Sequence, residues 1–136
     1  MIEVVNRQRK VRVDLEHWQT FSERALAVIQ KPTRDATIAF VSDRRMRDLN
    51  RQFRGIDKAT DVLSFPAGED SSTNLGDIAI SVERAEVQAK ENDLSSDQEI
   101  AQLILHGLLH LCGYDHETDN GEMNRLELRL RKKLQI

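Results

Sequence analysis

One stretch near the C-terminus, residues 106–116, constrains the fold of this chain more than any other part of the sequence. It reads His-Gly-Leu-Leu-His-Leu-Cys-Gly-Tyr-Asp-His and holds three of the protein's four histidines. Four residues advance an α-helix by slightly more than one turn, so His106 and His110 project from the same helix face. Gly113 suits the left-handed conformation that ends a helix, which lets the chain turn back and return His116 toward the other two imidazoles.

Three converging imidazoles predict a site for one Zn²⁺ ion, with His106, His110 and His116 as its ligands. Three protein ligands leave the fourth tetrahedral position for water, which distinguishes a catalytic zinc from a structural one. The alternative is a hydrogen-bonded structural cluster, but three histidines within eleven residues favour the metal. Cys112 lies about 200° round the helix from His110 and is predicted to be a small apolar residue rather than a ligand.

The helix that carries the first two histidines is predicted to be central to the fold. Its apolar residues cover most of the circumference, and they are Ile100, Leu103, Ile104, Leu105, Leu108, Leu109 and Leu111. His106 and His110 fall on the narrow remaining stripe, beside Glu99 and Gln102. A helix with so broad an apolar face is expected to lie in the core. The metal would then sit on a rigid element.

Periodicity and capping residues predict the other elements. Strands are expected at 2–5, 36–41, 60–65 and 77–81. Helices are expected at 14–30, after an N-cap at Ser42, from Ser81 to about Asn92, after a capping box formed by Ser96 and Glu99, and at 120–134. On the second helix Met46, Leu49 and Phe53 are expected to face inward, and Met123 is expected in the core. The sum is an α+β fold in one domain, residues 1–136. A small, four-stranded mixed sheet is covered by about five helices, with the histidine helix, similar to that of metzincins, at its centre.

Composition excludes several classes of protein. Hydrophobic residues make up 39% and charged residues 32% of the 136, as in soluble globular proteins, and a single cysteine excludes a disulfide framework. Residues 1–14 lack the apolar core of a signal peptide, and no apolar stretch is long enough to cross a bilayer. A cytoplasmic protein with no membrane partner is therefore expected.

Charge is unevenly distributed along the chain. The net charge of −3 gives no overall attraction to nucleic acid. However, residues 42–58 hold six basic residues against three acidic ones, and residues 122–136 hold five against two. These segments permit contacts to phosphate, but charge-rich helix faces are most often only solvated faces.

The histidine spacing, with Gly113 at the seventh position, coincides with the metzincin metallopeptidase pattern H-E-x-x-H-x-x-G-x-x-H. Gly107 stands where the peptidase has its glutamate, the general base. Metal chemistry is retained but the peptidase interpretation is weakened. Asp115, next to His116, is a candidate to orient a ligand imidazole or accept a proton, or is an ordinary turn residue.

Four blocks of the sequence together resemble the YbeY family of bacterial metallo-endoribonucleases. They are 49–55 (LNRQFRG), 60–66 (TDVLSFP), 75–78 (LGDI) and 106–116 (HGLLHLCGYDH). The resemblance implies cleavage of single-stranded RNA in ribosomal RNA maturation, including the 3′ end of 16S rRNA, and in ribosome quality control. The partners would be rRNA and the ribosome, and not DNA. It also implies that His106, His110 and His116 bind the zinc and that Arg54 binds the scissile phosphate or stabilises charge developing there.

Two questions stay open on sequence grounds. The nucleophile is either the ribose 2′-hydroxyl or a water activated by the metal, with Asp115 or a phosphate oxygen accepting a proton. The alternatives to an RNA-cleaving enzyme are a metallopeptidase and a non-enzymatic, ribosome-associated zinc module. Aromatic residues are only 4% of the chain, so contacts to the RNA backbone are expected to dominate binding.

Overall fold

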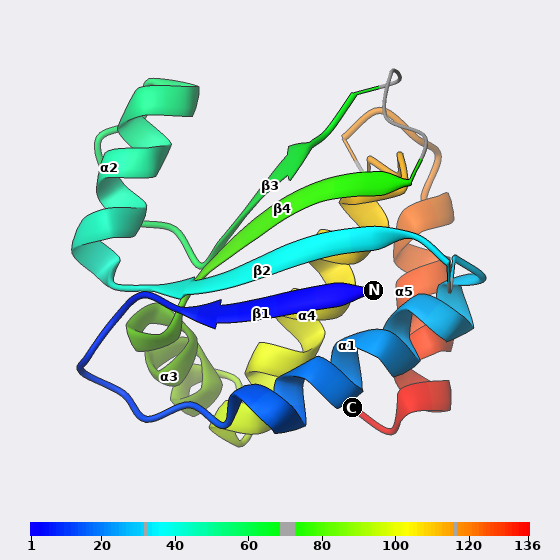
Figure 1. Ribbon diagram of the computed structural model, residues 1–136, viewed down its shortest axis with the longest axis horizontal. Coiled ribbons are helices and arrows are strands. Elements are labelled where there is room, and N and C mark those ends of the chain that lie inside the picture. Colours follow the sequence, from blue (N-terminus) through cyan, green and yellow to red (C-terminus); the bar gives the residue numbers. More distant parts are fainter. Residues whose placement is uncertain (32, 69–72, 116) are drawn as a thin grey trace.

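Strands and helices alternate along most of the chain. The computed structural model describes residues 1–31, 33–68, 73–115 and 117–136 (Figure 1). Over these residues the elements are β1 (Ile2–Asn6), α1 (Leu15–Ile29), β2 (Asp35–Val41), α2 (Asp43–Arg54), β3 (Val62–Pro66), β4 (Asn74–Ser81), α3 (Val82–Glu91), α4 (Ser96–Leu111) and α5 (Glu122–Leu134).

The four strands form one mixed sheet in the order β1-β2-β4-β3. β1, β2 and β4 run parallel to one another, and β3 pairs with β4 in the antiparallel sense at one edge. The predicted α+β fold, with a four-stranded mixed sheet and five helices, is therefore confirmed over the described residues.

Gly76 allows the edge strand β3 to approach β4. It pairs with Pro66 and has a φ of +132°, a conformation that side chains rarely adopt. A Cβ atom at this position would lie 2.2 Å from the carbonyl oxygen of Phe65. A glycine is therefore required here, and β3 is one wall of the site described below.

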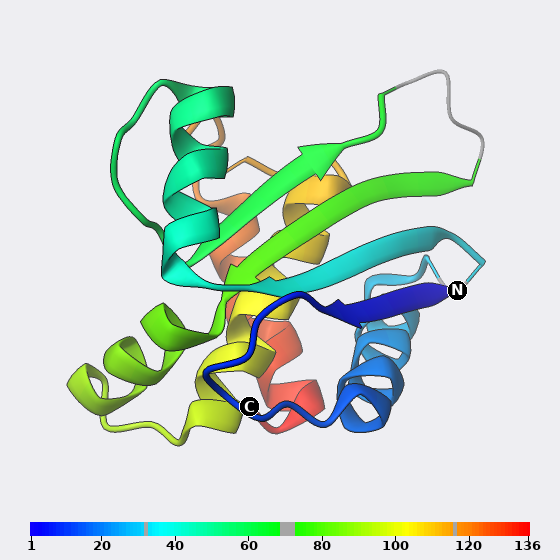
Figure 2. The same cartoon turned by 60° about the vertical axis from the view of Figure 1, so that its left-hand side comes forward.

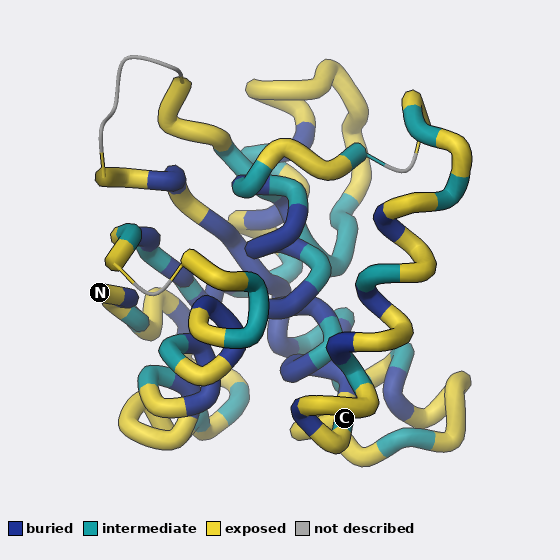
Figure 3. The backbone as a smooth tube through the Cα atoms, turned by 90° about the vertical axis from the view of Figure 1, so that its right-hand side faces the viewer, coloured by how far each residue is buried: buried dark blue, intermediate teal, exposed yellow. Residues whose placement is uncertain are grey.

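Helix α4 lies at the centre of the molecule, as its apolar circumference predicts. Its buried residues pack against α1, α5 and the inner face of the sheet, where Ile38, Ile78 and Ile80 are at most 1% exposed (Figures 1 and 3). The opposite face of the sheet carries a smaller cluster in which Met46 of α2 packs with Val41, Leu63 and Ala79. None of the helices in the described ranges is long and apolar enough to span a membrane.

The helix starts follow the predicted caps in two cases and differ in a third. Ser42 and Ser81 accept hydrogen bonds from the backbone N–H groups three residues on, as N-caps do. The capping box of α4, however, is formed by Ser95 and Gln98, one residue before the predicted Ser96 and Glu99. The Glu99 side chain is buried and accepts a hydrogen bond from Asn92 at the end of α3, so it does not cap the helix.

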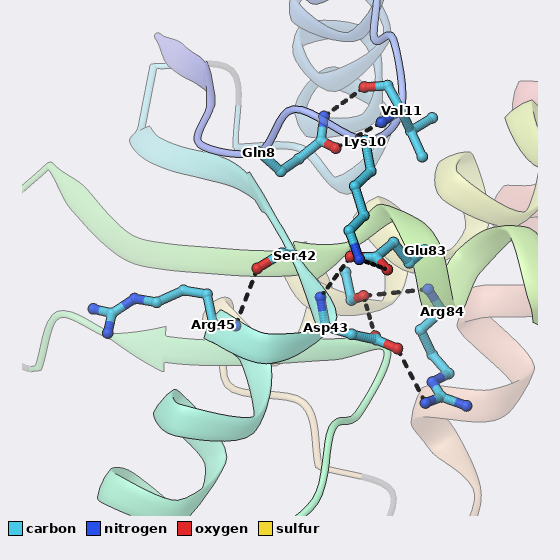
Figure 4. Close-up of polar contacts among 9 residues, drawn as sticks. Gln8, Lys10, Val11, Ser42, Asp43, Arg45, Glu83 and Arg84 are labelled. Carbon is cyan, nitrogen blue, oxygen red and sulfur yellow. Dashed lines mark hydrogen bonds and ion pairs between the residues drawn. The ribbon is translucent and has the colours of Figure 1, made fainter.

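A cluster of polar contacts joins the N-termini of α2 and α3 (Figure 4). The carboxylate of Asp43 accepts hydrogen bonds from the Ser81 hydroxyl at 2.5 Å and from the Arg84 guanidinium at 3.2 Å. Glu83 accepts one from the backbone N–H of Asp43 at 3.0 Å, and Lys10 forms an ion pair with the same carboxylate. These contacts fix the first turn of α2 against β4 and α3.

The far end of α2 is less firmly packed. Met46 is buried and Leu49 partly buried, whereas Phe53 is 59% exposed. Phe53 still lies on the predicted inner face, where its ring meets Phe65 of the edge strand β3 in a T-shaped contact, with the ring centroids 5.1 Å apart. Figures 1 and 2 show why Phe53 is exposed: the C-terminal half of α2 rises away from the sheet and stands apart from the other helices.

Candidate functional site

The two helix histidines converge, as their spacing predicts. The Nε2 atoms of His106 and His110 lie 3.1 Å apart. Two nitrogens bound to one tetrahedral zinc at about 2.0–2.1 Å would be separated by roughly 3.3 Å, so the pair fits a shared metal ion. Both histidines are partly exposed, so a metal bound between them would be reached from solvent.

The third predicted ligand, His116, lies outside the described residues. Within the ranges that the structure describes, no group of three histidine, cysteine or acidic side chains is placed to hold a metal ion. The three-histidine zinc shell, and zinc itself, therefore stay predictions.

Glu127 of α5 holds the His106 ring, a role that the sequence did not indicate. Its Oε1 lies 2.6 Å from Nδ1 of His106, and its Oε2 accepts a hydrogen bond from Arg131 at 3.0 Å. A carboxylate at Nδ1 favours the tautomer that carries its proton there, which leaves the Nε2 lone pair for a metal. Carboxylates in this position fix the orientation of metal-binding histidines in many proteins.

The charge of Glu127 is stabilised by its neighbours. Burial alone would raise the pKa of this carboxyl, but the hydrogen bond from His106 and the electrostatic interactions with His106, Arg131 and His110 outweigh it. The net result is a pKa below the ordinary value. Glu127 is therefore ionised near neutral pH and can accept the Nδ1 proton.

Both histidines open into a cavity of about 510 Å³ at the ends of α2 and α4 and along β3. Its lining includes the other two residues predicted to act in catalysis, Arg54 and Asp115. The full lining is Arg54, Val62, Leu63, Ser64, Pro66, His106, His110, Gly113, Tyr114, Asp115 and Glu117. Gly113 has a φ of +99°, so the turn that closes α4 has the left-handed backbone predicted for it.

Arg54 is the last residue of α2, and Gly55, with a φ of +72°, ends the helix just beyond it. Two other arginines of α2, Arg47 and Arg51, form ion pairs outside the cavity. Arg47 forms two hydrogen bonds with Asp57, and Arg51 pairs with both Asp48 and Asp57. Over the described ranges Arg54 forms no ion pair, and it is the one arginine of α2 that lines this cavity.

Asp115 serves the turn as well as the cavity. Its Oδ1 accepts a hydrogen bond from the backbone N–H of Glu117 at 3.0 Å, and its carbonyl oxygen accepts one from Thr118. The turn interpretation of Asp115 is thus supported directly. Its position in the cavity wall keeps the proton-acceptor role as a hypothesis.

Comparison with known proteins identifies the family. The model of the family described as endoribonuclease YbeY matches residues 3–135. The chain belongs to this endoribonuclease YbeY family.

Individual members are similar over most of their length. The endoribonuclease YbeY of Nitratiruptor sp. is 42% identical over 130 residues, which cover 96% of this chain and 86% of the relative. That of Nautilia profundicola is 50% identical over 103 residues, or 76% and 74% of the two chains. The solution structure of the Thermotoga maritima protein TM1509 superposes with a TM-score of 0.70 at 28% identity, covering 98% of this chain and 89% of the other. Membership of the YbeY family supports an enzyme that acts on RNA.

In this YbeY-family chain, the packing around Gly107 explains why position 107 does not hold the glutamate base of a peptidase. A Cβ atom at Gly107 would lie 2.9 Å from Cδ1 and 3.1 Å from Cγ2 of Ile78, which is buried in the sheet. The backbone carbonyl of Gly107 accepts a hydrogen bond from Ser64 of β3 at 3.4 Å. Position 107 therefore packs directly against the sheet, and a glutamate there would collide with the core.

Cys112 lies apart from the candidate ligands. It lines a separate cavity with Ile29 and Lys31, and burial raises the pKa of its thiol. The prediction that it points away from the histidine site is confirmed.

Proposed function

We propose that this protein is a zinc-dependent endoribonuclease that cleaves single-stranded RNA in the maturation and quality control of ribosomal RNA. The observation that carries the proposal is that the Nε2 atoms of His106 and His110 meet in the same cavity as Arg54. A histidine pair placed to share a metal, and an arginine that forms no ion pair with any residue the structure describes, match the two needs of phosphodiester cleavage, a Lewis acid and a cation for the phosphate.

His106, His110 and His116 would hold the metal in this proposal. Bound zinc supplies a Lewis acid that polarises a phosphate oxygen and lowers the pKa of a nearby water or hydroxyl. Glu127 keeps the Nδ1 proton of His106 in place and so presents Nε2 in the orientation that a metal needs.

Arg54 lines the same cavity and binds the scissile phosphate there. A guanidinium donates parallel hydrogen bonds to two oxygens of one phosphate and stabilises the extra negative charge of the pentavalent transition state. Asp115 is the candidate proton acceptor, because its Oδ1 is bound by the turn while its side chain borders the same cavity.

The identity of the nucleophile decides what the products carry. Attack by the ribose 2′-hydroxyl leaves a 2′,3′-cyclic phosphate, whereas attack by water leaves a simple phosphate end. Cleavage followed by mass spectrometry of the 3′ ends separates the two routes. A substrate with 2′-deoxyribose at the cleavage site should block the first route and leave the second intact.

The alternative of a peptidase is disfavoured by the packing at Gly107, where a glutamate base would have no room. The metal chemistry alone gives no reason to prefer peptide bonds, and Arg54 has no evident role in their hydrolysis. Incubation of the zinc-loaded protein with an unstructured peptide and with single-stranded RNA compares the two activities directly. Peptide cleavage without RNA cleavage would contradict the proposal.

Zinc dependence is tested by replacing one predicted histidine ligand and, as a control, the histidine that lies outside the site. His110→Ala should abolish RNA cleavage and high-affinity zinc binding, because it removes one of three ligands. His17→Ala removes the fourth histidine, which is exposed on α1, and should change neither. Glu127→Gln should weaken zinc binding about 10- to 100-fold, as loss of a ligand's hydrogen-bond partner does.

The readouts are cleavage of a labelled single-stranded RNA, with a chelator control, and zinc affinity from competition with a chromogenic chelator. Cleavage that persists in the chelated sample or in His110→Ala would contradict the proposal. A zinc module without enzymatic activity would bind the metal with the same dependence on His110 but leave the RNA intact.

A further inference from the structure

A second cavity adjoins the histidine cavity, and we propose that it binds a nucleobase bearing an exocyclic amino group and disfavours uracil. The inference rests on the proposed function, since the base would belong to the RNA being cleaved. The cavity has a volume of about 770 Å³, within the usual range for small-molecule sites. Its lining is Asp61, Val62, Gln88, Glu91, Asn92, Leu94, Glu99, Gln102, Leu103, His106 and Arg131.

The two cavities meet at His106 and Val62, which line both. Val62 begins the edge strand β3, and His106 lies on α4, which packs against β3. A phosphate held between Arg54 and the histidines would therefore have one of its flanking nucleosides beside the second cavity. Unpaired bases of single-stranded RNA can be turned out of the strand into such a pocket.

The polar part of the second cavity is built around a buried carboxylate. Glu99 is 6% exposed and accepts a hydrogen bond from the Asn92 amide at 3.5 Å. The Gln88 amide lies between two carboxylates and forms hydrogen bonds only with its nitrogen toward them, donating to Glu99 at 3.2 Å and Asp61 at 3.0 Å. Each carboxylate oxygen has two lone pairs, so these contacts leave acceptor capacity for a ligand.

The charge of the cavity favours the edge of a base over a phosphate. Among the lining residues that the structure describes, three are acidic, Asp61, Glu91 and Glu99, and one is a permanent cation, Arg131, which is bound to Glu127. This surplus of negative charge repels the RNA backbone, whereas carboxylate oxygens accept hydrogen bonds from amino groups. Cytosine, adenine and guanine offer such amino donors on their edges. Uracil offers carbonyl oxygens in the corresponding places, which would face the acidic side chains unpaired.

The remaining walls suit the flat faces of a base. Val62, Leu94 and Leu103 contribute apolar side chains, and the lining residues that the structure describes include no Phe, Tyr or Trp, so that His106 supplies the one ring. Preference among bases is therefore set by hydrogen bonds to their edges rather than by stacking. A site that hydrogen-bonds one base discriminates strongly against a base that leaves its polar groups unpaired.

The first arm of the test uses the zinc-loaded protein on a pool of single-stranded RNA with randomised sequence. Sequencing of the product ends should show uridine depleted on the order of tenfold at one position next to the cut. Glu99→Gln replaces an acceptor by a group that also donates, and should reduce this depletion to within about twofold. Asp97→Asn, on the same helix but exposed and outside the cavity, is the matched control and should keep the wild-type pattern. Gln88→Leu is a second variant in case Glu99→Gln folds poorly.

The second arm does not depend on cleavage. Cytidine, adenosine, guanosine and uridine are titrated separately into the protein while the side-chain amide signals of Gln88, Asn92 and Gln102 are followed by NMR. The amides should shift with the first three nucleosides, and tenfold less with uridine at equal concentration. If these shifts occur but RNA is not cleaved, the proposed function fails and the base site stands. If uridine shifts the amides as much as cytidine does, or if none of the four does, the base site is overturned whatever the cleavage result.

Discussion

The two ends of helix α2 are built on opposite principles. At the N-terminal end, Asp43 is fastened by Ser81 and Arg84, and its backbone N–H by Glu83 (Figure 4). At the C-terminal end, Arg54 lines the histidine cavity without a partner carboxylate among the described residues, and the ring of Phe53 is largely exposed. The N-terminal end of the helix is held by these contacts, and the C-terminal end places Arg54 in the wall of the histidine cavity.

A count of charges does not show which basic residue is available to a ligand. Residues 42–58 hold six basic residues against three acidic ones, which gives this segment a net positive charge in the sequence. In three dimensions Arg47 and Arg51 form ion pairs with Asp57 and Asp48. Arg54 differs from both, because it lines the histidine cavity and forms no ion pair with the residues that the structure describes.

The largest effect is expected at the projecting end. Arg54→Ala should lower kcat/KM for RNA cleavage by about 10²- to 10³-fold, the usual cost of removing one donor to transition-state charge. Arg54→Lys should recover only part of the loss, because an ammonium lacks the fork of donors that matches a phosphate. Zinc affinity and the free energy of unfolding should not change in either variant.

Arg47→Ala is the matched control for this prediction, because it removes an arginine from the same helix that pairs with Asp57 instead of lining the cavity. Cleavage by Arg47→Ala should stay within about threefold of the wild type, since surface ion pairs contribute little. Equal losses from Arg47→Ala and Arg54→Ala would mean that the helix acts only through its total charge.

A smaller effect is expected from loosening the anchored end. Asp43→Ala removes the acceptor for Ser81 and Arg84 and should lower the free energy of unfolding by about 1–3 kcal/mol. Asp48→Ala, which takes away only an exposed ion pair with Arg51, should cost about 0.5 kcal/mol or less. Urea denaturation followed by circular dichroism measures both. A loss from Asp48→Ala as large as that from Asp43→Ala would show that the cluster in Figure 4 does not anchor the helix.

Much of the fold could be predicted because it depends on local patterns. The alternating and helical spacing of apolar residues located every strand and helix, and Ser42 and Ser81 marked two helix starts. The error at the start of α4 arose because residues distant in the sequence decide which of two adjacent serines caps the helix. Ser95 and Ser96 are both suitable N-caps, and the burial of Glu99 against Gln88 and Asn92 leaves the cap to Ser95.

In the candidate site, too, the features set by local spacing could be predicted and those set by distant contacts could not. The paired histidines follow from helix geometry within five residues, so their convergence could be predicted. Glu127 could not, because its contact with His106 spans 21 residues and depends on how α5 packs against α4. In the sequence, Glu127 and Arg131 have only the spacing of an ordinary helix ion pair. Periodicity also placed Phe53 on the inner face of α2, where it contacts Phe65. It does not show how deeply each residue on that face is buried, and Phe53 is 59% exposed.

The smallest predicted effect concerns the ion pairs that neutralise α2. The hydrogen bond from Arg47 is the main cause that lowers the pKa of the Asp57 carboxyl. Desolvation opposes it, and the charges of Arg47 and Arg51 lower the pKa further. Because the pKa is lower in the folded state, the pair contributes stability above the unfolded pKa of about 3.9 and loses it as the pH falls through the folded value. In carboxyl ¹³C NMR titrations the Asp57 midpoint should lie below about 3.9 in the wild type and rise in Arg47→Ala. High salt should raise the wild-type midpoint, since the pair is exposed to solvent. A midpoint that is ordinary in the wild type and unmoved by Arg47→Ala would mean that Arg47 is not held by Asp57, and that it is as available to RNA as Arg54.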